Sequence, residues 1–376
     1  MKNAFKRNFR ILSVITLLYL FLVSIKLIGS SFKMFGSGFA ENLICSCSNP
    51  IVGLFIGILT TSIIQSSSTT TSLVVGFVGG GMLPLDYAIP IIMGANIGTT
   101  ITNSLVSLSF VTRREDFRRA FSGATMHDFF NLCSVILFLP LELKFHFLQR
   151  SAIFLTKIFE TVGGVKLTSP LKLIIDPVIG IIKHFLKDII NTPDMLCGII
   201  MFSVSVFVMI FSLVYIVKVM RSLVISKTEG FIHKYLFRND ATAFILALSL
   251  TAIMQSSSVT TALVVPLIGS GILTVYRAYP YVLGANLGTT LTALLASLAT
   301  VSIVNGKAVN TIGITAAFAH FMFNICGIAV FYPLRKIPIY FSTKISDLAY
   351  RKRRWALIYV LGFFIIIPLA VIFFIR

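Results

Sequence analysis

Gln65-Ser66-Ser67-Ser68 stands inside an apolar stretch that begins with Ile51-Val-Gly-Leu-Phe-Ile-Gly-Ile-Leu and resumes at Leu73-Val-Val. The same four residues return as Gln255-Ser256-Ser257-Ser258, again between apolar segments. Four polar residues in a row are costly in an apolar helix, so a second copy in the same surroundings is a specific signal. The second copy therefore indicates an internal repeat.

The repeat has a shift of 190 positions. It lays Gly94-Ala-Asn-Ile-Gly-Thr-Thr100 on Gly284-Ala-Asn-Leu-Gly-Thr-Thr290, and 24 of the 44 aligned positions between 65–108 and 255–298 are identical. Two unrelated apolar segments would share Leu and Val but would not align Gln, Ser, Asn and Thr. The chain therefore contains two copies of one unit.

Composition predicts an all-α integral membrane protein. Hydrophobic residues make up 56% of the 376 residues, charged residues 12%, and the mean hydropathy is +0.94. The net charge of +19 lies in short segments between apolar runs. That distribution follows the positive-inside rule and argues against nucleic acid as a partner.

The cysteines indicate neither a metal site nor a disulfide scaffold. No pair has a CxxC spacing, and Cys133, Cys197 and Cys326 suit small apolar positions in helices. The spacing of Cys45 and Cys47 argues against a bridge between the two, whereas a bond from either to Cys197 stays open.

Each repeat is expected to contain a re-entrant hairpin and a broken helix. Residues 51–79 form two arms of about fourteen residues, each shorter than the roughly twenty needed to cross a membrane, and 241–269 do the same. The runs 83–110 and 273–300 are long enough, but Gly94, Asn96 and Gly98 interrupt the first and their counterparts the second. We therefore expect a break in each helix near mid-membrane.

Seven crossings follow, at 11–32, 83–110, 120–140, 196–217, 273–300, 312–334 and 355–375. We expect the chain to lie in the cell membrane with its N-terminus in the cytoplasm. Because the number of crossings is odd, Arg376 then lies outside. The domain boundaries are 1–50 for the first span and external segment, 51–140 for repeat 1, 141–195 for an external linker near the membrane surface, 196–240 for a span and basic cytoplasmic segment, 241–334 for repeat 2, and 335–376 for a basic cytoplasmic segment and last span.

The two repeats are predicted to have inverted topology. Arg113, Arg114, Arg118 and Arg119 follow the first broken helix, whereas Lys307 is the only charged residue in the loop after the second. The positive-inside rule places the first loop in the cytoplasm and the other outside. Inverted repeats are typical of secondary transporters and put the substrate site near the membrane midplane.

The repeated polar residues suit an anion and a monovalent cation. Serine hydroxyls and the amides that begin the second hairpin arm can bind an oxyanion without a buried basic residue. Free carbonyls of an unwound segment, together with side-chain oxygens, suit Na⁺ better than Ca²⁺ or Mg²⁺, because no carboxylate cluster accompanies them. Those side chains are Asn96, Asn286, Thr99, Thr100, Thr289, Thr290 and Thr292.

The doubled Gln-Ser-Ser-Ser, each followed by Gly-Ala-Asn-(Ile/Leu)-Gly-Thr-Thr, resembles the type II sodium-dependent phosphate cotransporters over residues 51–140 and 241–334. The resemblance implies Na⁺-driven uptake of inorganic phosphate by alternating access, with Na⁺ as coupling ion and no other cofactor. It also implies that Gln65 to Ser68 and Gln255 to Ser258 hold phosphate, with which we group Asn96 and Asn286. For sodium it indicates Gln255, Ser256, Thr289 and Thr292, to which we add Thr99, Thr100, Thr290 and Asp86.

Several alternatives remain from the residues alone. Hydroxyls and amides do not distinguish phosphate from sulfate or arsenate. A different class of function, a passive anion channel or a non-transporting membrane scaffold, is the other alternative. Asp86 is either a cation ligand or a solvated turn residue, and Asp128 is expected to pair with a neighbouring helix. No Ser-His-Asp, Walker or GxSxG pattern is present, so we do not expect an enzyme. The expected partners are phosphate, sodium ions and lipid, with a homodimer also considered.

Overall fold

The structure is a computed structural model that describes residues 2–32, 34, 49–161, 164–236, 239–304 and 307–375. The expectations about Cys45, Cys47 and the position of Arg376 lie outside these residues.

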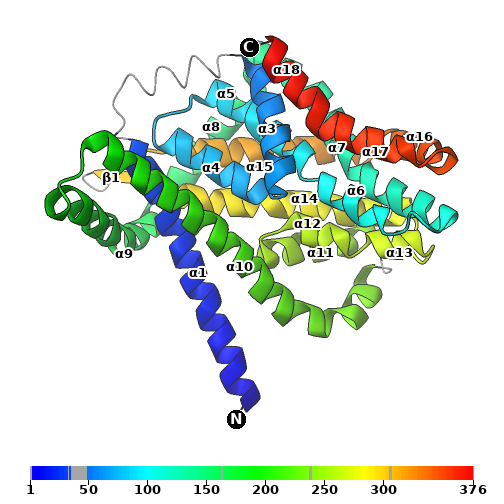
Figure 1. The fold of residues 1–376 in the computed structure, drawn as a ribbon, viewed down its shortest axis with the longest axis horizontal. Coiled ribbons are helices and arrows are strands. Elements are labelled where there is room, and N and C mark those ends of the chain that lie inside the picture. The colour runs from blue at the N-terminus through cyan, green and yellow to red at the C-terminus, as the bar shows by residue number, and fades with distance from the viewer. Residues whose placement is uncertain are drawn as a thin grey trace.

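The described chain is helical apart from one short antiparallel hairpin (Figure 1). The first half contains α1 Lys2–Phe32, α3 Pro50–Ile64, α4 Ser67–Gly79, α5 Leu85–Gly98, α6 Ile101–Leu108 and α7 Arg114–Phe145. The connecting part contains α8 Phe147–Thr161, α9 Gly164–His184, the π-helix η1 Phe185–Ile189 and α10 Asp194–Leu236. The second half contains α11 Asp240–Met254, α12 Ser257–Ala262, α13 Val265–Gly269, α14 Val275–Leu298, β1 Ser302–Val304, β2 Lys307–Asn310 and α15 Ile312–Phe331. The chain continues with α16 Lys336–Arg351, α17 Arg354–Leu361, the π-helix η2 Gly362–Ile366 and α18 Ile367–Ile375.

Seven stretches of the described chain are long and apolar enough to cross a membrane, as the sequence predicted. They are Leu12–Ser31, Leu85–Leu108, Arg114–Phe145, Asp194–Val219, Val275–Leu298, Ile312–Phe331 and Arg354–Ile375. The hairpin helices α3 and α11 have 15 residues each. At 1.5 Å per residue they are about 22 Å long, shorter than a hydrocarbon core of about 30 Å.

Glycine lets the first arm of each hairpin lie directly on the crossing helix of the same repeat. A Cβ atom on Gly94 of α5 would lie 1.9 Å from the carbonyl oxygen of Leu54, and one on Gly57 of α3 would lie 2.0 Å from that of Ile91. In the second repeat a Cβ atom on Gly284 of α14 would lie 2.1 Å from the carbonyl oxygen of Phe244. No larger residue fits these contacts without separating the backbones.

The expected breaks at the Gly-Ala-Asn-(Ile/Leu)-Gly segments are wrong. Gly94, Asn96 and Gly98 all lie inside α5, and the interruption comes later, at Thr99 and Thr100. In the second repeat α14 runs unbroken through the corresponding segment. Tertiary packing overrides the low helix propensity of glycine, because the glycines are the points where another backbone approaches. The unwound carbonyls expected there are therefore absent from the described segments.

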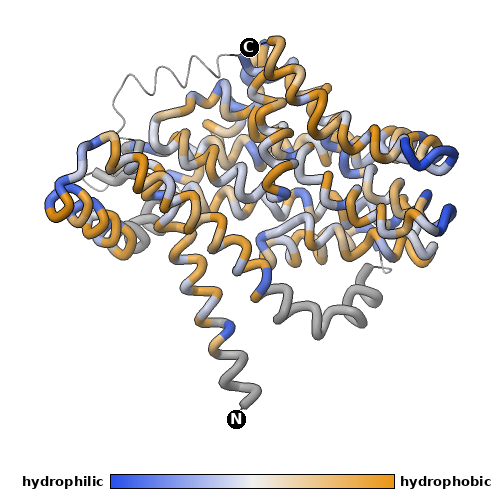
Figure 2. The backbone as a smooth tube through the Cα atoms, in the orientation of Figure 1, coloured by the Kyte–Doolittle hydropathy of each residue, from blue (hydrophilic) through white to orange (hydrophobic). Residues whose placement is uncertain are grey.

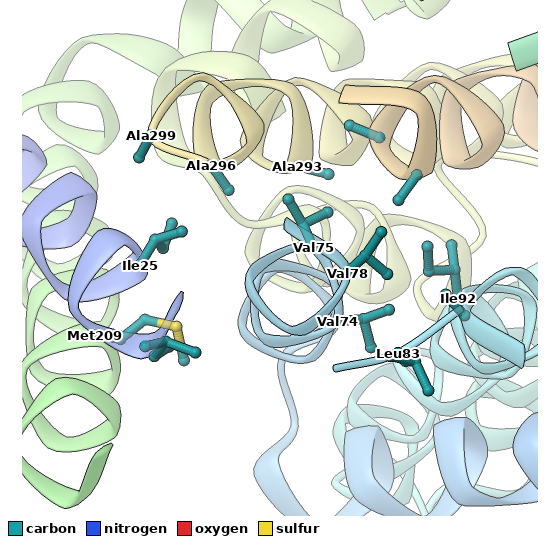
Figure 3. Packing of buried hydrophobic residues seen from close by; sticks show 14 of the residues in the cluster. Ile25, Val74, Val75, Val78, Leu83, Ile92, Met209, Ala293, Ala296 and Ala299 are labelled. Carbon is teal, nitrogen blue, oxygen red and sulfur yellow. The ribbon is translucent and has the colours of Figure 1, made fainter. Parts of the chain in front are cut away.

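The second arm of the first hairpin, α4, is enclosed by protein. Val74, Val75 and Val78 pack against Ile25 of α1 and Ala293 of α14, among others (Figure 3). Met209 of α10 belongs to the same cluster. A polar tip can be carried into the molecule because apolar contacts surround the helix that follows it.

The segment 141–195 is part of this packing. Leu148 and Ala152 of α8 are fully buried in one cluster with Phe323 of α15. Thr156 Oγ1 lies 3.0 Å from Thr315 Oγ1, in hydrogen-bonding distance. The predicted linker contains α8, α9 and η1, and its position outside the membrane stays a prediction.

The ends of the two hairpins contact different parts of the molecule. At the end of α4, the carbonyl oxygen of Gly79 accepts a hydrogen bond from Asn310 Nδ2 at 2.7 Å. At the end of α13, a Cβ atom on Gly269 would lie 3.2 Å from Cβ of Ala120, and one on Gly271 would lie 2.9 Å from the guanidinium of Arg119.

Two basic segments meet at one end of the molecule. Arg118 Nε lies 3.0 Å from Asp347 Oδ1, and a guanidinium nitrogen of Arg353 lies 3.5 Å from the carbonyl oxygen of Thr112. Figure 2 shows hydrophilic residues gathered where α16 joins α17, next to apolar helices. The sequence placed both segments in the cytoplasm, and the structure puts them on the same side as each other.

Candidate functional site

Each Gln-Ser-Ser-Ser forms the turn of a helical hairpin. Gln65 ends α3 in the left-handed conformation, with φ 57° and ψ 29°, and its N–H donates to the carbonyl oxygen of Thr61. Ser66 then caps α4, because its Oγ accepts a hydrogen bond from the N–H of Thr69. A left-handed C-cap followed at once by a serine N-cap reverses the chain in two residues.

The second tip repeats this geometry. Gln255 has φ 55° and ψ 26°, and Ser256 Oγ accepts from the N–H of Val259. Matching hydroxyl bonds join the arms, from Thr61 to Thr70 at 2.9 Å and from Thr251 to Thr260 at 3.0 Å. The sequence repeat is thus a repeat of local structure.

The two tips meet. Ser68 Oγ donates to the carbonyl oxygen of Gln255 at 3.1 Å, which links one tip to the other directly. Thr99, at the interruption between α5 and α6, accepts from Ser67 Oγ at 3.1 Å and lies 3.2 Å from Ser258 Oγ. Residues separated by about 190 positions therefore form one hydrogen-bonded group.

A cavity of about 570 Å³ adjoins this group. Gln65 and Ser66 line it from the first tip, and Gln255, Ser256 and Ser258 line it from the second. The remaining wall is mostly apolar and comes from α3, α4, α6, α10, α12 and Leu263. Such a cavity is large enough for a small hydrated ion and presents polar groups from both repeats.

Several buried oxygens beside the tips lack a hydrogen-bond partner among the described residues. They are Gln255 Oε1, Thr292 Oγ1 and Thr102 Oγ1. Buried polar atoms are nearly always paired, so oxygens of this kind indicate a place for a cation or water. Gln255 and Thr292 were predicted as sodium ligands, whereas Thr102 was missed, although the 190-residue shift makes it the counterpart of Thr292.

Three further threonines predicted as sodium ligands, Thr289, Thr290 and Thr100, bond nearby backbone carbonyls. Thr289 Oγ1 donates to the carbonyl oxygen of Ala285, and the hydroxyls of Thr290 and Thr100 donate to the carbonyl oxygen three residues earlier. A hydroxyl that donates in this way still has lone pairs for a cation. These contacts leave their role as ligands a prediction.

Asn96 and Asn286 belong to a buried network between the repeats. Asn96 Nδ2 donates to Asn324 Oδ1 at 3.3 Å, and Asn286 Nδ2 donates to Asn131 Oδ1 at 3.1 Å and to Asn324 Oδ1 at 2.9 Å. His320 Nε2 lies 3.0 Å from Asn96 Oδ1. The network joins α5, α7, α14 and α15, and neither Asn96 nor Asn286 lines the cavity.

The two aspartates have different settings. Asp86 is half exposed in the first turn of α5, and its Oδ1 lies 3.4 Å from His146 Nδ1. Thirteen residues of helix separate it from Thr99, about 20 Å, so the structure does not bring Asp86 to the tips. Asp128 is buried and accepts a hydrogen bond from Tyr359 of α17 at 2.7 Å, which confirms its expected pairing with a neighbouring helix.

These features define a helical membrane protein in which two copies of one hairpin meet beside a cavity that their polar tips help to line. A family model described as Na⁺/Pi-cotransporter matches residues 20–159 and 208–337. The chain belongs to this family.

Named relatives extend over nearly the whole chain. Sodium-dependent phosphate transport protein 2B of Pongo abelii is 33% identical over 450 aligned positions, which cover 96% of this chain and 65% of that protein. Sodium-dependent phosphate transport protein 2A of Rattus norvegicus is 33% identical over 422 positions, 93% of this chain and 65% of that protein. The chain thus spans a little under two thirds of these relatives. No solved structure matches.

Replacement of Asn286 by Ala tests the network. The variant loses its bonds to Asn131 and Asn324 and leaves buried amides unpaired, which should destabilise the protein by about 2 kcal/mol. We expect a lower melting temperature in detergent, while the folded fraction keeps its half-saturating phosphate concentration. A wild-type melting temperature with a large rise in that concentration would instead make Asn286 a phosphate ligand.

Proposed function

We propose that this chain imports inorganic phosphate together with Na⁺ and holds phosphate between the two Gln-Ser-Ser-Ser tips. The observation that carries the proposal is the direct contact of the tips beside a shared cavity. Hydroxyls from both tips and the amides that begin α4 are the donors that an oxyanion needs. The names of the relatives, which describe sodium-dependent phosphate transport, support the same substrate and coupling ion.

Sodium binds, in this proposal, beside the second tip. Gln255 Oε1 and Thr292 Oγ1 are buried oxygens without a partner among the described residues. Ser256 directly follows Gln255 at the tip, and Thr289 lies one turn before Thr292 in α14. Neutral oxygens suit Na⁺ because they lower the energy of one charge without requiring a carboxylate. A cation there also offsets the charge of phosphate in the cavity.

Two re-entrant hairpins of opposite direction provide alternating access. The end of α4 contacts Asn310, in the loop predicted to be outside, whereas the end of α13 lies beside Arg119, in the loop predicted to be cytoplasmic. Opposite hairpins that meet at their tips place the substrate between two gates. In this proposal the N-terminus lies in the cytoplasm and the chain lies in the cell membrane, as the positive-inside rule predicts.

Cysteine labelling tests the inversion. Single cysteines at Glu115 and at Asn305, which lies outside the described residues, should react with an impermeant maleimide from opposite sides in a background without native cysteines. The positive-inside rule is the reason, since four arginines accompany one position and one lysine the other. Labelling of both from one side would end the inverted-repeat proposal.

Transport itself is tested by uptake of radiolabelled phosphate into proteoliposomes under an imposed Na⁺ gradient. We expect saturable, concentrative uptake that stops when choline replaces Na⁺. Uptake unaffected by choline would rule out coupling, and flux without saturation or accumulation would indicate a channel. Stronger competition by sulfate or arsenate than by unlabelled phosphate would change the assigned oxyanion.

Serine-to-alanine changes test whether the tips act as one site. Ser67→Ala and Ser257→Ala should each raise the half-saturating phosphate concentration about ten- to a hundredfold, because a lost hydrogen bond to a charged ligand costs about 1.5 to 3 kcal/mol. Gln65→Ala and Gln255→Ala should act similarly, and paired changes should be non-additive since they share one ligand.

Ser107→Ala and Ser297→Ala are the matched controls. Both serines are buried outside the tips, and each hydroxyl donates to a carbonyl oxygen of its own helix. Tip variants that transported as well as these controls would show that the tips are structural.

A further inference from the structure

α10 forms one wall of the cavity that the tips share. Ile210, Leu213, Val214, Val217 and Lys218 line the cavity, and their spacing of three and four residues places them on one face of the helix. Four of these side chains are apolar and the last is positively charged. Lys218 is the only charged side chain among the described residues that line the cavity.

Lys218 lies at the end of the apolar part of α10. The candidate span reaches Val219, and the side chain of Lys218 is exposed. Its Nζ lies 4.9 Å from the centre of the Tyr215 ring, a cation–π contact that favours this position of the ammonium group. Lys218 therefore stands at the mouth of the cavity rather than beside the tips.

The mouth faces the side that the sequence assigns to the cytoplasm. Val106 of α6 also lines the cavity, and α6 leads directly to the loop with Arg113 and Arg114. Basic residues likewise follow Lys218 along the chain, at Arg221 and Lys227. Both walls thus run from the tips toward segments that the positive-inside rule places inside the cell.

We propose that Lys218 is the positive charge that phosphate meets between the two tips and the cytoplasm, and that it sets phosphate affinity on that side. This inference rests on the proposed function. The tips supply hydroxyls and amides but no basic side chain, and the α10 wall is otherwise apolar. A positively charged ammonium group at the mouth raises the local concentration of anions. It also lowers the electrostatic energy of a divalent anion that passes along the apolar wall of the cavity.

A charge that acts from the mouth has a recognisable signature. Its effect depends on the sign of the charge rather than on the shape of the side chain. Arginine at this position therefore keeps the effect, and glutamate reverses it. Because the mouth is open to solvent, the effect also weakens as ionic strength rises and the Debye length falls below about 8 Å. A residue needed only for packing shows neither dependence.

Lys344 of α16 offers a matched control. Its side chain is exposed, and its Nζ lies 5.4 Å from the centre of the Tyr340 ring, so it makes the same kind of contact. It does not line the cavity. Lys344→Glu therefore reverses an equivalent charge at a site away from the pathway.

The test is Na⁺-dependent exchange of labelled phosphate in proteoliposomes. Phosphate and Na⁺ concentrations are equal on both sides, so protein inserted in either orientation contributes to the measured exchange. The full chain is compared with Lys218→Arg, Lys218→Gln, Lys218→Glu and Lys344→Glu, at low ionic strength and in added choline chloride. We expect Lys218→Glu to raise the half-saturating phosphate concentration about fivefold at low ionic strength and Lys218→Gln about twofold. Lys218→Arg and Lys344→Glu should match wild type, and the differences should shrink in choline chloride.

Equal effects of Lys218→Glu and Lys344→Glu would overturn the inference, as would an effect that ignores ionic strength or a Lys218→Arg variant as impaired as Lys218→Glu. Lys218→Gln keeps the test decisive if charge reversal lowers the amount of folded protein. A wild-type chain without Na⁺-dependent exchange would overturn the proposed function and the inference together. Normal wild-type exchange with an unaffected Lys218→Glu overturns the inference alone.

Discussion

A polar group placed inside an apolar membrane protein needs a partner, and each tip finds its partner in the other repeat. The hydroxyl of Ser68 reaches the backbone of Gln255, and Thr99 joins Ser67 to Ser258. Alone, either tip would leave several buried groups unsatisfied, at a few kcal/mol each. Contact between the repeats satisfies part of that demand, and Gln255 Oε1, Thr102 Oγ1 and Thr292 Oγ1 stay unpaired among the described residues.

Glycine lets the first arm of each hairpin pack directly against the crossing helix of its own repeat. At Gly57, Gly94 and Gly284 a helix backbone passes so close to another that a Cβ atom would lie about 2 Å from a carbonyl oxygen. The short first arm of each hairpin is thereby held against a long crossing helix, which fixes the position of the tip relative to that helix. The low helix propensity of glycine is the smaller effect, about 1 kcal/mol per residue, beside the packing that these positions permit.

The two copies are alike in sequence and unequal in structure. α4 is continuous where its counterpart is divided into α12 and α13, and α14 is continuous where its counterpart is divided into α5 and α6. Unpaired buried oxygens occur in both copies, at Thr102 in the first and at Gln255 and Thr292 in the second. Two copies of one sequence unit therefore fold into different arrangements of helices within one structure.

Sequence alone determined the repeat, the two tips and the seven candidate spans, because each rests on composition or on spacing along the chain. It misjudged the breaks at Gly94–Gly98, since whether a glycine breaks a helix or admits a neighbour depends on what packs against it. The network of Asn96 and Asn286, the distance of Asp86 from the tips and the place of Lys218 on the cavity wall were likewise decided by tertiary structure. Each depends on contacts between segments far apart in the chain, which local periodicity does not encode.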